Sequence, residues 1–323
     1  MTAKKHHFKS VTYAGLAPGP KLIVTGAVHG NETCGTRGIQ RVMAEIDSGG
    51  VEIAAGTVTF VPITNPLAYA KGERAGDRNL NRNLSPNANP VDFEDHVANW
   101  LCPLLSRHEV LLDLHSTRAR TQPFALFGPD NNSGKVEPFQ QSEKERALVR
   151  RLGVSRFVQG WLATYAKGVE RRIAEARHKG VTGDRLTADP KYGVGTTEYM
   201  RSQGGYSITL ECGQHDDPSS PEVAYRAIRN TLDFLGITEG EPPAPVEKYE
   251  ALRIHDVIDR AHEGDRFAKE WSSFDPLAKG ELIGTRHDGT EVRAPGDGWI
   301  LFPDKGSKPG NEWFYLAQPL EKI

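Results

Sequence analysis

The chain has 323 residues, enough for one large domain with or without a small one, and its 37% hydrophobic and 25% charged content is ordinary for a soluble protein. Its 40 lysine and arginine residues nearly balance 42 acidic residues, which excludes the basic surface of a protein that binds nucleic acid or acidic membranes. The sequence shows no membrane span of about 18 apolar residues, no secretory signal and no disulfide framework among its three scattered cysteines, so we expect a cytoplasmic protein.

From its N-terminus, the chain alternates apolar runs typical of strands with amphipathic segments typical of helices. In order, these patterns predict a strand at 21–28, a helix at 36–46, a strand at 57–62, a helix at 93–105 and a strand at 110–115. The polar stretch 65–90 has no regular pattern. Strands and helices that alternate in this way favour an α/β sheet covered by helices.

The same alternation continues to residue 235. Amphipathic spacing predicts helices at 143–152 and 161–179, and the glycine-rich, charged stretch 180–205 is typical of a long surface loop. A strand at 207–212 and a helix at 222–235 complete this part of the chain. We therefore expect a large α/β domain over residues 1–240.

The composition changes near residue 240. The segment 239–245, EGEPPAP, cannot form a helix or a central strand, and we place a domain boundary there. Beyond it, short apolar runs are separated by turns, and HDGT at 287–290 is typical of a hairpin turn. We expect a small β-rich domain over residues 246–323.

Polar side chains stand at the ends of two predicted strands. HGNE, residues 29–32, follows the first strand, and DLH, residues 113–115, ends the third. The carboxyl ends of strands in an open α/β sheet meet at one edge, where ligands bind. His29, Glu32 and His115 would give three ligands and leave an open position, as a catalytic zinc requires. Taken alone, His29 and Glu32 also fit a solvated loop.

Two carboxylates within predicted strands need an explanation, because a buried carboxylate is costly unless it is paired or used. Asp113 shares a strand face with His115 and could orient it; a carboxylate capped by backbone amides is an equal alternative. Glu211, in the strand SITLEC, points to the face opposite Cys212. Beside a metal-activated water, Glu211 would act as a general base.

The polar stretch before the second helix contains arginines and asparagines at short spacing. The residues concerned are Arg74, Arg78, Asn79, Asn81, Arg82 and Asn83. One interpretation is a solvated run of charges. Alternatively, an arginine beside a zinc ion could stabilise the oxyanion that develops on a scissile carbonyl, and an Asn–Arg pair could bind a substrate carboxylate.

Together, these motifs resemble the succinylglutamate desuccinylase/aspartoacylase family of the zinc carboxypeptidase clan. HGNE, the NP…R…NLNR stretch, DLHST and the LECG strand occur in the order found in that family, over roughly residues 21–235. Each motif alone is weak, whereas four in order are specific. The resemblance implies a zinc-carboxypeptidase-like mixed sheet flanked by helices, with a small C-terminal β-rich domain.

The resemblance also implies the metal ligands and the catalytic groups. His29, Glu32 and His115 match the zinc ligands of the family. Glu211 matches the catalytic glutamate, and Arg74 matches the arginine that polarises the substrate carbonyl.

Four further residues match positions that bind substrate. Asn81 and Arg82 match the pair that binds the substrate's α-carboxylate. Arg201, ten residues before the catalytic glutamate, resembles the arginine that holds a second carboxylate. Tyr315 resembles a tyrosine that reaches the site from the small β domain. The chain departs from most of the family in a longer segment between the third zinc ligand and the catalytic glutamate.

The function implied is that of a zinc-dependent amidohydrolase, with one zinc ion per chain, that cleaves the amide bond of a small N-acyl amino acid or related N-acyl amine. Two alternatives stay open: a metallocarboxypeptidase that acts on short peptides, and a binding protein of the same fold without catalysis. The expected partner is a small-molecule N-acyl substrate, without nucleic acid or membrane, and the relatives suggest a homodimer.

Overall fold

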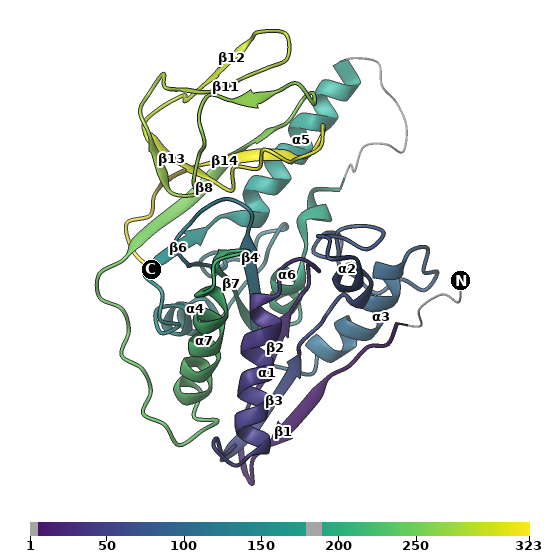
Figure 1. The fold of residues 1–323 in the computed structure, drawn as a ribbon, viewed down its shortest axis with the longest axis vertical. Coiled ribbons are helices and arrows are strands. Elements are labelled where there is room, and N and C mark those ends of the chain that lie inside the picture. The colour runs from purple at the N-terminus through teal and green to yellow at the C-terminus, as the bar shows by residue number, and fades with distance from the viewer. Residues whose placement is uncertain (1–5, 179–188) are drawn as a thin grey trace.

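A computed structural model describes residues 6–178 and 189–323, in which a large mixed sheet is flanked by helices (Figure 1). Within these residues, the large sheet has the strand order β1-β3-β2-β4-β7-β5-β6-β8-β14-β13-β10, and a smaller sheet has the order β12-β11-β9. The strands are β1 Val11–Ala14, β2 Ala17–Gly26, β3 Ala55–Val61, β4 Val110–Thr117, β5 Phe124–Leu126, β6 Arg156–Gln159, β7 Tyr206–Gln214, β8 Glu250–Asp259, β9 Arg266–Phe267, β10 Asp275–Leu277, β11 Leu282–Thr285, β12 Glu291–Arg293, β13 Gly298–Leu301 and β14 Glu312–Pro319. The helices are α1 Cys34–Asp47, α2 Pro66–Lys71, α3 Phe93–Leu105, α4 Ser142–Val149, α5 Trp161–His178, the 3₁₀ helix Pro190–Gly193, α6 Thr196–Ser202 and α7 Ser220–Phe234. The expected α/β class, with a mixed sheet and a C-terminal β-rich part, is confirmed.

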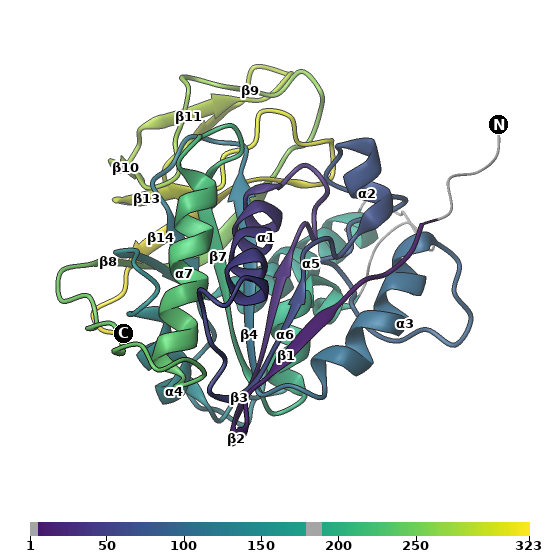
Figure 2. The ribbon, with the colours of Figure 1, turned by 60° about the horizontal axis from the view of Figure 1, so that its bottom comes forward.

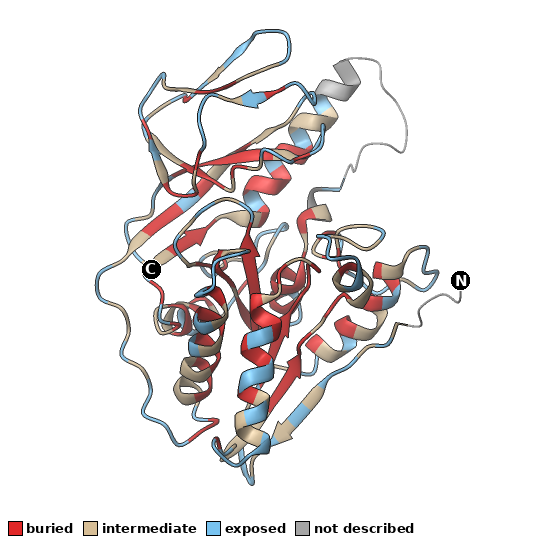
Figure 3. Ribbon diagram, viewed as in Figure 1, coloured by how far each residue is buried: buried red, intermediate tan, exposed pale blue. Residues whose placement is uncertain are grey.

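Next to the edge strand β1, the large sheet contains four neighbouring parallel strands, β3, β2, β4 and β7. Their apolar runs are buried on both faces, as is typical of parallel sheets (Figure 3). One face packs against α1 and α7, which lie side by side (Figure 2). The other face packs against α3 and α6. Side chains that alternate along β4 and β7 therefore point to two different layers of helices.

The strands and helices expected up to residue 235 are present, with ends that differ by a few residues, and α3 has the expected bounds. Residue 179, the expected end of one helix, lies outside the described residues. The polar stretch 65–90 is not wholly irregular, because it contains the short helix α2. Asn65 caps α2, Pro66 begins it, and Gly72 ends it with a left-handed φ of 66°.

The expectation of a surface loop over 180–205 is wrong for the part of it that the structure describes. Residues 180–188 lie outside the described part of the chain, and α6 occupies much of the remainder. This helix carries buried side chains, among them Met200, which packs in the core between the sheet and α3. The glycines that suggested a loop mark the ends of the helix instead, with Gly195 at the N-cap and Gly204 just beyond the C-terminus at a φ of 87°.

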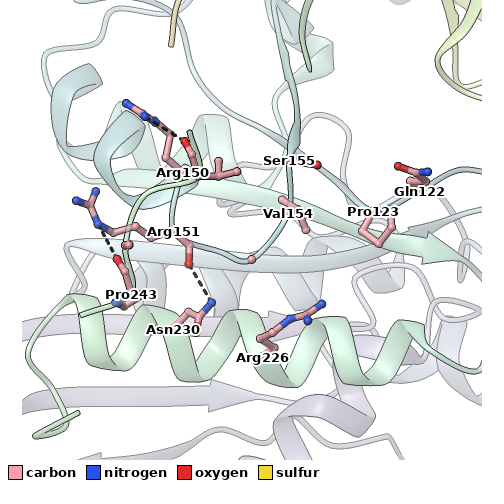
Figure 4. Close-up of a pocket in the computed structure, with 12 residues that line it drawn as sticks. Gln122, Pro123, Arg150, Arg151, Val154, Ser155, Arg226, Asn230 and Pro243 are labelled. Atoms are coloured by element: carbon pink, nitrogen blue, oxygen red, sulfur yellow. Dashed lines mark hydrogen bonds between the residues drawn. The ribbon is translucent and has the colours of Figure 1, made fainter. Parts of the chain in front are cut away.

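The segment at the expected domain boundary has no regular secondary structure and is attached to the end of α4. Arg151 Nε donates to the carbonyl of Pro243 at 3.1 Å, and Arg150 Nη2 donates to the carbonyl of Val246 at 3.0 Å (Figure 4). Asn230, on α7, donates to the carbonyl of Arg151 at 3.0 Å. These bonds fix the path along which the chain leaves α7 and enters β8.

Beyond this segment, the strands extend the large sheet. β8 pairs with β6 in parallel, and β14 pairs with β8 in antiparallel orientation. β11 and β12 flank the HDGT turn as an antiparallel pair, so the expected hairpin is confirmed. The hydrogen-bonded ladder is therefore continuous between the two parts of the chain, and their division into domains at 1–240 and 246–323 stays a prediction.

Arg201, on α6, lies within a cluster of buried carboxylates. Its Nε is 2.6 Å from Glu137, its Nη1 is 3.1 Å from Glu145, and its Nη2 is 2.9 Å from Glu198. Nη1 also donates to the carbonyl of Ser207, at the start of β7, at 3.2 Å. This arginine therefore holds α6 against α4 and the sheet.

We predict that the protonation of Glu145 makes the stability of the protein depend on pH. Burial raises the pKa of Glu145 from 4.5 to about 7, against the pull of Arg201. The folded state therefore binds this proton more tightly than the unfolded chain does, so the stabilising contribution is present below pH 4.5 and is lost as the pH rises through about 7. Relative to Glu145→Gln, the wild type should lose on the order of 2–3 kcal/mol of unfolding free energy between pH 5 and pH 8.

Urea unfolding of both proteins at the two pH values measures this difference. Glutamine does not titrate, so contributions from groups that do not interact with Glu145 are present in both proteins and cancel. A difference in unfolding free energy that stays constant over this range would show that Glu145 is ionised throughout.

Candidate metal centre

The HGNE turn follows β2 on a backbone that requires small residues. Ala27 has a φ of 48°, in the left-handed region, and turns the chain out of the strand. A Cβ on Gly30 would lie 2.0 Å from the backbone of Ala68 in α2, so no larger residue fits there. The turn therefore packs directly on α2 and brings His29 within hydrogen-bonding distance of Glu32.

The carboxylate of Glu32 lies between two imidazoles. Its Oε1 is 2.9 Å from His29 Nδ1, and its Oε2 is 2.8 Å from His115 Nδ1. The three side chains are buried, and one possible ligand atom from each lies within 4.8 Å of the others. Ser116 N also donates to Glu32 Oε2 at 3.2 Å. The structure thus brings together the three residues that were expected to bind a metal ion.

Each imidazole is held by a second partner on its other nitrogen. His29 Nε2 is 3.0 Å from Asn79 Oδ1, and His115 Nε2 is 2.8 Å from Asp113 Oδ2. Oxygen acceptors at Nε2 favour a proton on that nitrogen. Each Nδ1 then faces the carboxylate of Glu32, where its lone pair would be available to a cation bound beside that carboxylate.

Asp113 is itself fixed by hydroxyl groups. Thr25 Oγ1, on β2, donates to its Oδ1 at 2.6 Å, and Thr196 Oγ1, at the start of α6, donates to its Oδ2. Because these donors are hydroxyls rather than backbone amides, the structure favours the interpretation in which Asp113 orients His115. Thr196 N also donates to Asn81 Oδ1 at 2.8 Å. Helix α6 therefore connects the support of this histidine to the loop that carries Asn81.

Burial and neighbouring charges set the protonation of the three residues. Burial lowers the pKa of His29 to about 4, and Arg74 adds to this effect, so the imidazole is neutral at pH 7. Burial opposes the charge on His115, but Asp113 and Glu32 hold its pKa well above the ordinary value. Burial also opposes ionisation of Glu32, yet His29 and His115 hold its pKa well below the usual range. A divalent cation at His115 Nδ1 would take the place of that proton.

Two imidazole nitrogens and one carboxylate oxygen form a donor set that suits a divalent metal ion with a position left for water. The nitrogens that face Glu32 are not used by the supporting hydrogen bonds, which engage the other nitrogen of each ring. The residues present therefore fit a catalytic metal site.

Glu211, in the second half of β7, pairs with His115 across the parallel strands β4 and β7. Its carboxylate is buried, and its Oε2 makes no hydrogen bond to any residue that the structure describes. Burial raises the pKa of Glu211 to about 8, and Glu32 adds to this effect against the pull of His115. A buried carboxylate oxygen without a partner needs a ligand or a water, and its raised pKa suits a group that accepts and returns a proton.

Arg74 reaches the same group from the polar stretch before α3. Its Nη1 donates to Glu32 Oε1 at 2.9 Å, while 47% of its side chain is exposed. A guanidinium at the rim of the metal group can turn from Glu32 toward a substrate oxygen on which negative charge develops.

Asn81 and Arg82 lie on the loop packed against α6 and α5. A Cβ on Gly195 would lie 2.0 Å from Asn81 Oδ1, so the glycine at the N-cap of α6 makes room for this amide. Arg82 is buried, with its guanidinium 5.0 Å from the ring centre of Trp161 and its Nη2 3.8 Å from Glu312 Oε1. Arg82 lies against α5 and β14, and its remaining N–H groups can bind a substrate carboxylate.

Tyr315 and Arg201 differ in their relation to this site. Tyr315 OH, on β14, is buried without a hydrogen-bond partner in the described part of the chain, and its ring lies 5.4 Å from that of Trp161. Arg201 is engaged by its carboxylates and by Ser207, which stands four residues before Glu211, or about 13 Å along β7. The structure therefore does not bring Arg201 to the metal group, because protein partners already surround its guanidinium.

Some contacts of the site were not predicted from the sequence. Asn79 was noted only as one asparagine of the polar stretch, and Thr196 had no recognisable signal. His215 was not assigned a role, yet its Nδ1 is 2.9 Å from Ser116 Oγ and its Nε2 is 3.4 Å from Asn31 Nδ2. The only available signal for His215 was its position shortly after the strand end that carries the glutamate.

We predict that Thr196→Val weakens zinc binding by about tenfold, because valine keeps the shape of the side chain but removes the hydroxyl that fixes Asp113. Thr196→Ser keeps the hydroxyl and is the matched control, with an affinity close to that of the wild type. Competition with a chelating dye measures the zinc affinity of all three proteins. Equal affinities for the wild type and Thr196→Val would show that Asp113 needs no support from α6.

The sequence matches a known catalytic domain over more than half of its length. Residues 18–183 match the model of the succinylglutamate desuccinylase/aspartoacylase catalytic domain. The N-alpha-acetyl-L-2,4-diaminobutyric acid deacetylase of Halomonas elongata is 25% identical over 305 residues, which cover 89% of this chain and 78% of that protein.

Solved structures share the fold. The succinylglutamate desuccinylase/aspartoacylase of Rhodobacter sphaeroides gives a TM-score of 0.70 at 16% identity, covering 97% of this chain and 90% of that one. The product-bound ectoine utilization protein EutE (DoeB) of Ruegeria pomeroyi gives a TM-score of 0.70 at 20% identity, covering 96% and 88%. The chain therefore belongs to the succinylglutamate desuccinylase/aspartoacylase family, whose members are amide hydrolases.

Proposed function

We propose that this chain is a zinc-dependent amidohydrolase that cleaves the amide bond of a small N-acyl amino acid or related N-acyl amine. The proposal is supported most directly by Glu211 Oε2, a buried oxygen without a partner among the described residues, on the residue that pairs with the expected ligand His115 across neighbouring strands. A metal site with a carboxylate base beside it is equipped for hydrolysis by an activated water. The deacetylase of Halomonas elongata supports an N-acyl amino acid as substrate.

His29, Glu32 and His115 would hold one zinc ion per chain, since two imidazoles and a carboxylate are a ligand set of catalytic zinc. When bound, zinc supplies the Lewis acidity that activates water near neutral pH. Asn79 and Asp113 keep the two imidazoles in the orientation that this requires.

The other side chains would bind the substrate and transfer the proton. Glu211 accepts a proton from the attacking water and passes it to the departing nitrogen. Arg74 donates to the carbonyl oxygen as negative charge develops on it. Asn81 and Arg82 hold the substrate carboxylate, and Tyr315 OH adds a donor from β14.

We also place the enzyme in the cytoplasm. Cys34, Cys102 and Cys212 are free and buried, which supports a reducing compartment. Among the described helices, none is long and apolar enough to cross a lipid bilayer. A homodimer stays a prediction.

We predict that Glu211→Gln lowers kcat for the hydrolysis of N-acyl amino acids by a factor on the order of 10² to 10⁴, because an amide cannot accept the proton of the attacking water. The zinc content should equal that of the wild type, since this residue is not one of the three ligands. Steady-state kinetics and elemental mass spectrometry measure the two quantities.

Glu32→Gln is the matched control, because the same chemical change at a ligand should reduce zinc content as well as activity. A loss of less than tenfold in Glu211→Gln would reject Glu211 as the general base. If zinc-loaded wild type hydrolyses no N-acyl amino acid, the assignment as an amidohydrolase fails.

A further inference from the structure

His115, Glu211 and Phe124 occupy neighbouring positions on one face of the sheet. Glu211 pairs with His115 across β4 and β7, and with Phe124 across β7 and β5. Paired residues on adjacent strands point to the same face, about 4.8 Å apart. His115, Glu211 and Phe124 therefore form a row across β4, β7 and β5. In this row the aromatic side chain of Phe124 lies on the side of Glu211 that faces away from the metal group.

Phe124 is covered by two phenylalanines whose backbone is strained. The rings of Phe274 and Phe302 lie 5.2 and 5.4 Å from that of Phe124, both edge to face. Phe274 has a φ of 72° and Phe302 a φ of 50°, in a region that bulky residues rarely adopt. Such conformations persist where the surrounding structure enforces them, and they are concentrated at ligand sites. The strained segments hold both rings over Phe124, in the row that contains Glu211.

The aromatic surface extends from Phe302 to Arg82. The ring of Phe302 lies 5.9 Å from that of Tyr315, which lies 5.4 Å from Trp161, and the guanidinium of Arg82 is 5.0 Å from Trp161. Trp161 and Phe302 are partly exposed. We call these three rings, Phe302, Tyr315 and Trp161, the aromatic wall. A substrate whose amide faces Glu211 and whose carboxylate reaches Arg82 would run along this wall.

Among the residues that the structure describes, two arginines near the aromatic wall already have acidic partners. Arg82 Nη2 lies 3.8 Å from Glu312, and Arg172 is bound by both oxygens of Asp259 at 2.7 and 2.9 Å. Arg201 belongs to its own cluster of carboxylates. As far as the described residues go, a second carboxylate on the substrate would therefore meet aromatic rings and the negative charge of Glu312, and would lose its hydration without gaining a cation.

We propose that the substrate is an N-acyl amino acid with one carboxylate, bound at Arg82, and an uncharged apolar side chain that packs against Trp161 and Phe302. This inference rests on the amidohydrolase function proposed above and defines its substrate class. An apolar side chain is stabilised when it leaves water for an aromatic surface, whereas an acidic one is not.

N-acetyl-leucine and N-acetyl-aspartate test this class directly, because their side chains branch alike and differ in charge. We expect kcat/KM for the leucine derivative to exceed that for the aspartate derivative by at least tenfold. N-acetyl-2,4-diaminobutyrate is the second comparison, because aromatic ring faces and the negative charge of Glu312 attract a cationic side chain as well. A preference for either charged derivative would overturn the proposal.

A variant of the aromatic wall links this preference to the structure. Trp161→Ala should lower the ratio of kcat/KM for N-acetyl-leucine to that for N-acetylglycine by about tenfold. A general loss of activity, such as one caused by a displacement of Arg82, lowers kcat/KM for both substrates equally, because both carry the same carboxylate. It therefore leaves the ratio unchanged. Trp161→Phe keeps an aromatic ring and should keep most of the ratio. An unchanged ratio in Trp161→Ala would exclude the wall from binding the side chain.

The same assays separate this inference from the proposed function. Hydrolysis of charged and apolar derivatives at equal rates would leave the amidohydrolase in place and reject the apolar subsite. Absence of hydrolysis across both the N-acetyl series and the matching N-succinyl series would reject the two proposals together.

Discussion

The contact of one carboxylate with two imidazoles is the constraint on which the rest of this site depends. Glu32 meets Nδ1 of His29 and of His115, while Asn79 and Asp113 hold the opposite nitrogens. The contact exists because β2 and β4 are neighbouring parallel strands, whose ends reach the same edge of the sheet. A shift in their pairing would separate two ligands that lie far apart in the sequence. The pairing of β2 with β4 therefore determines both the packing of the sheet and the position of the metal group.

Two elements outside the central strands complete the site. Helix α6 supplies Thr196, which bonds both to Asp113 and to the loop that carries Asn81. The carboxylates around Arg201 hold this helix in place, so that the arginine supports the site from a distance. On the other side, β14 brings Tyr315 against α5 and closes the wall beside the proposed carboxylate pocket. Recognition of the substrate side chain is then assigned to aromatic rings rather than to a second cation.

The parts of the structure with strong local signals could be predicted from the sequence. Buried strands and amphipathic helices were recognisable from their periodicity, and polar residues at strand ends indicated the metal group. Helix α2 was missed although Asn65, Pro66 and Gly72 are ordinary signals for its ends, because the helix is short and lies in a polar stretch. Helix α6 was missed because its flanking glycines resemble those of a loop. The position of Arg201 could not be predicted, since a spacing relative to Glu211 does not show that carboxylates from other segments surround the guanidinium.

X-ray absorption at the zinc K edge, measured on the purified protein together with its zinc content per chain, tests the central claim most directly. The account predicts one zinc ion per chain, bound by two imidazoles and by oxygen donors, with the imidazole signal reduced in His115→Ala. Sulfur in the coordination shell, which would implicate Cys34 or Cys212, would contradict the account. A chain that takes up no zinc would contradict it as well.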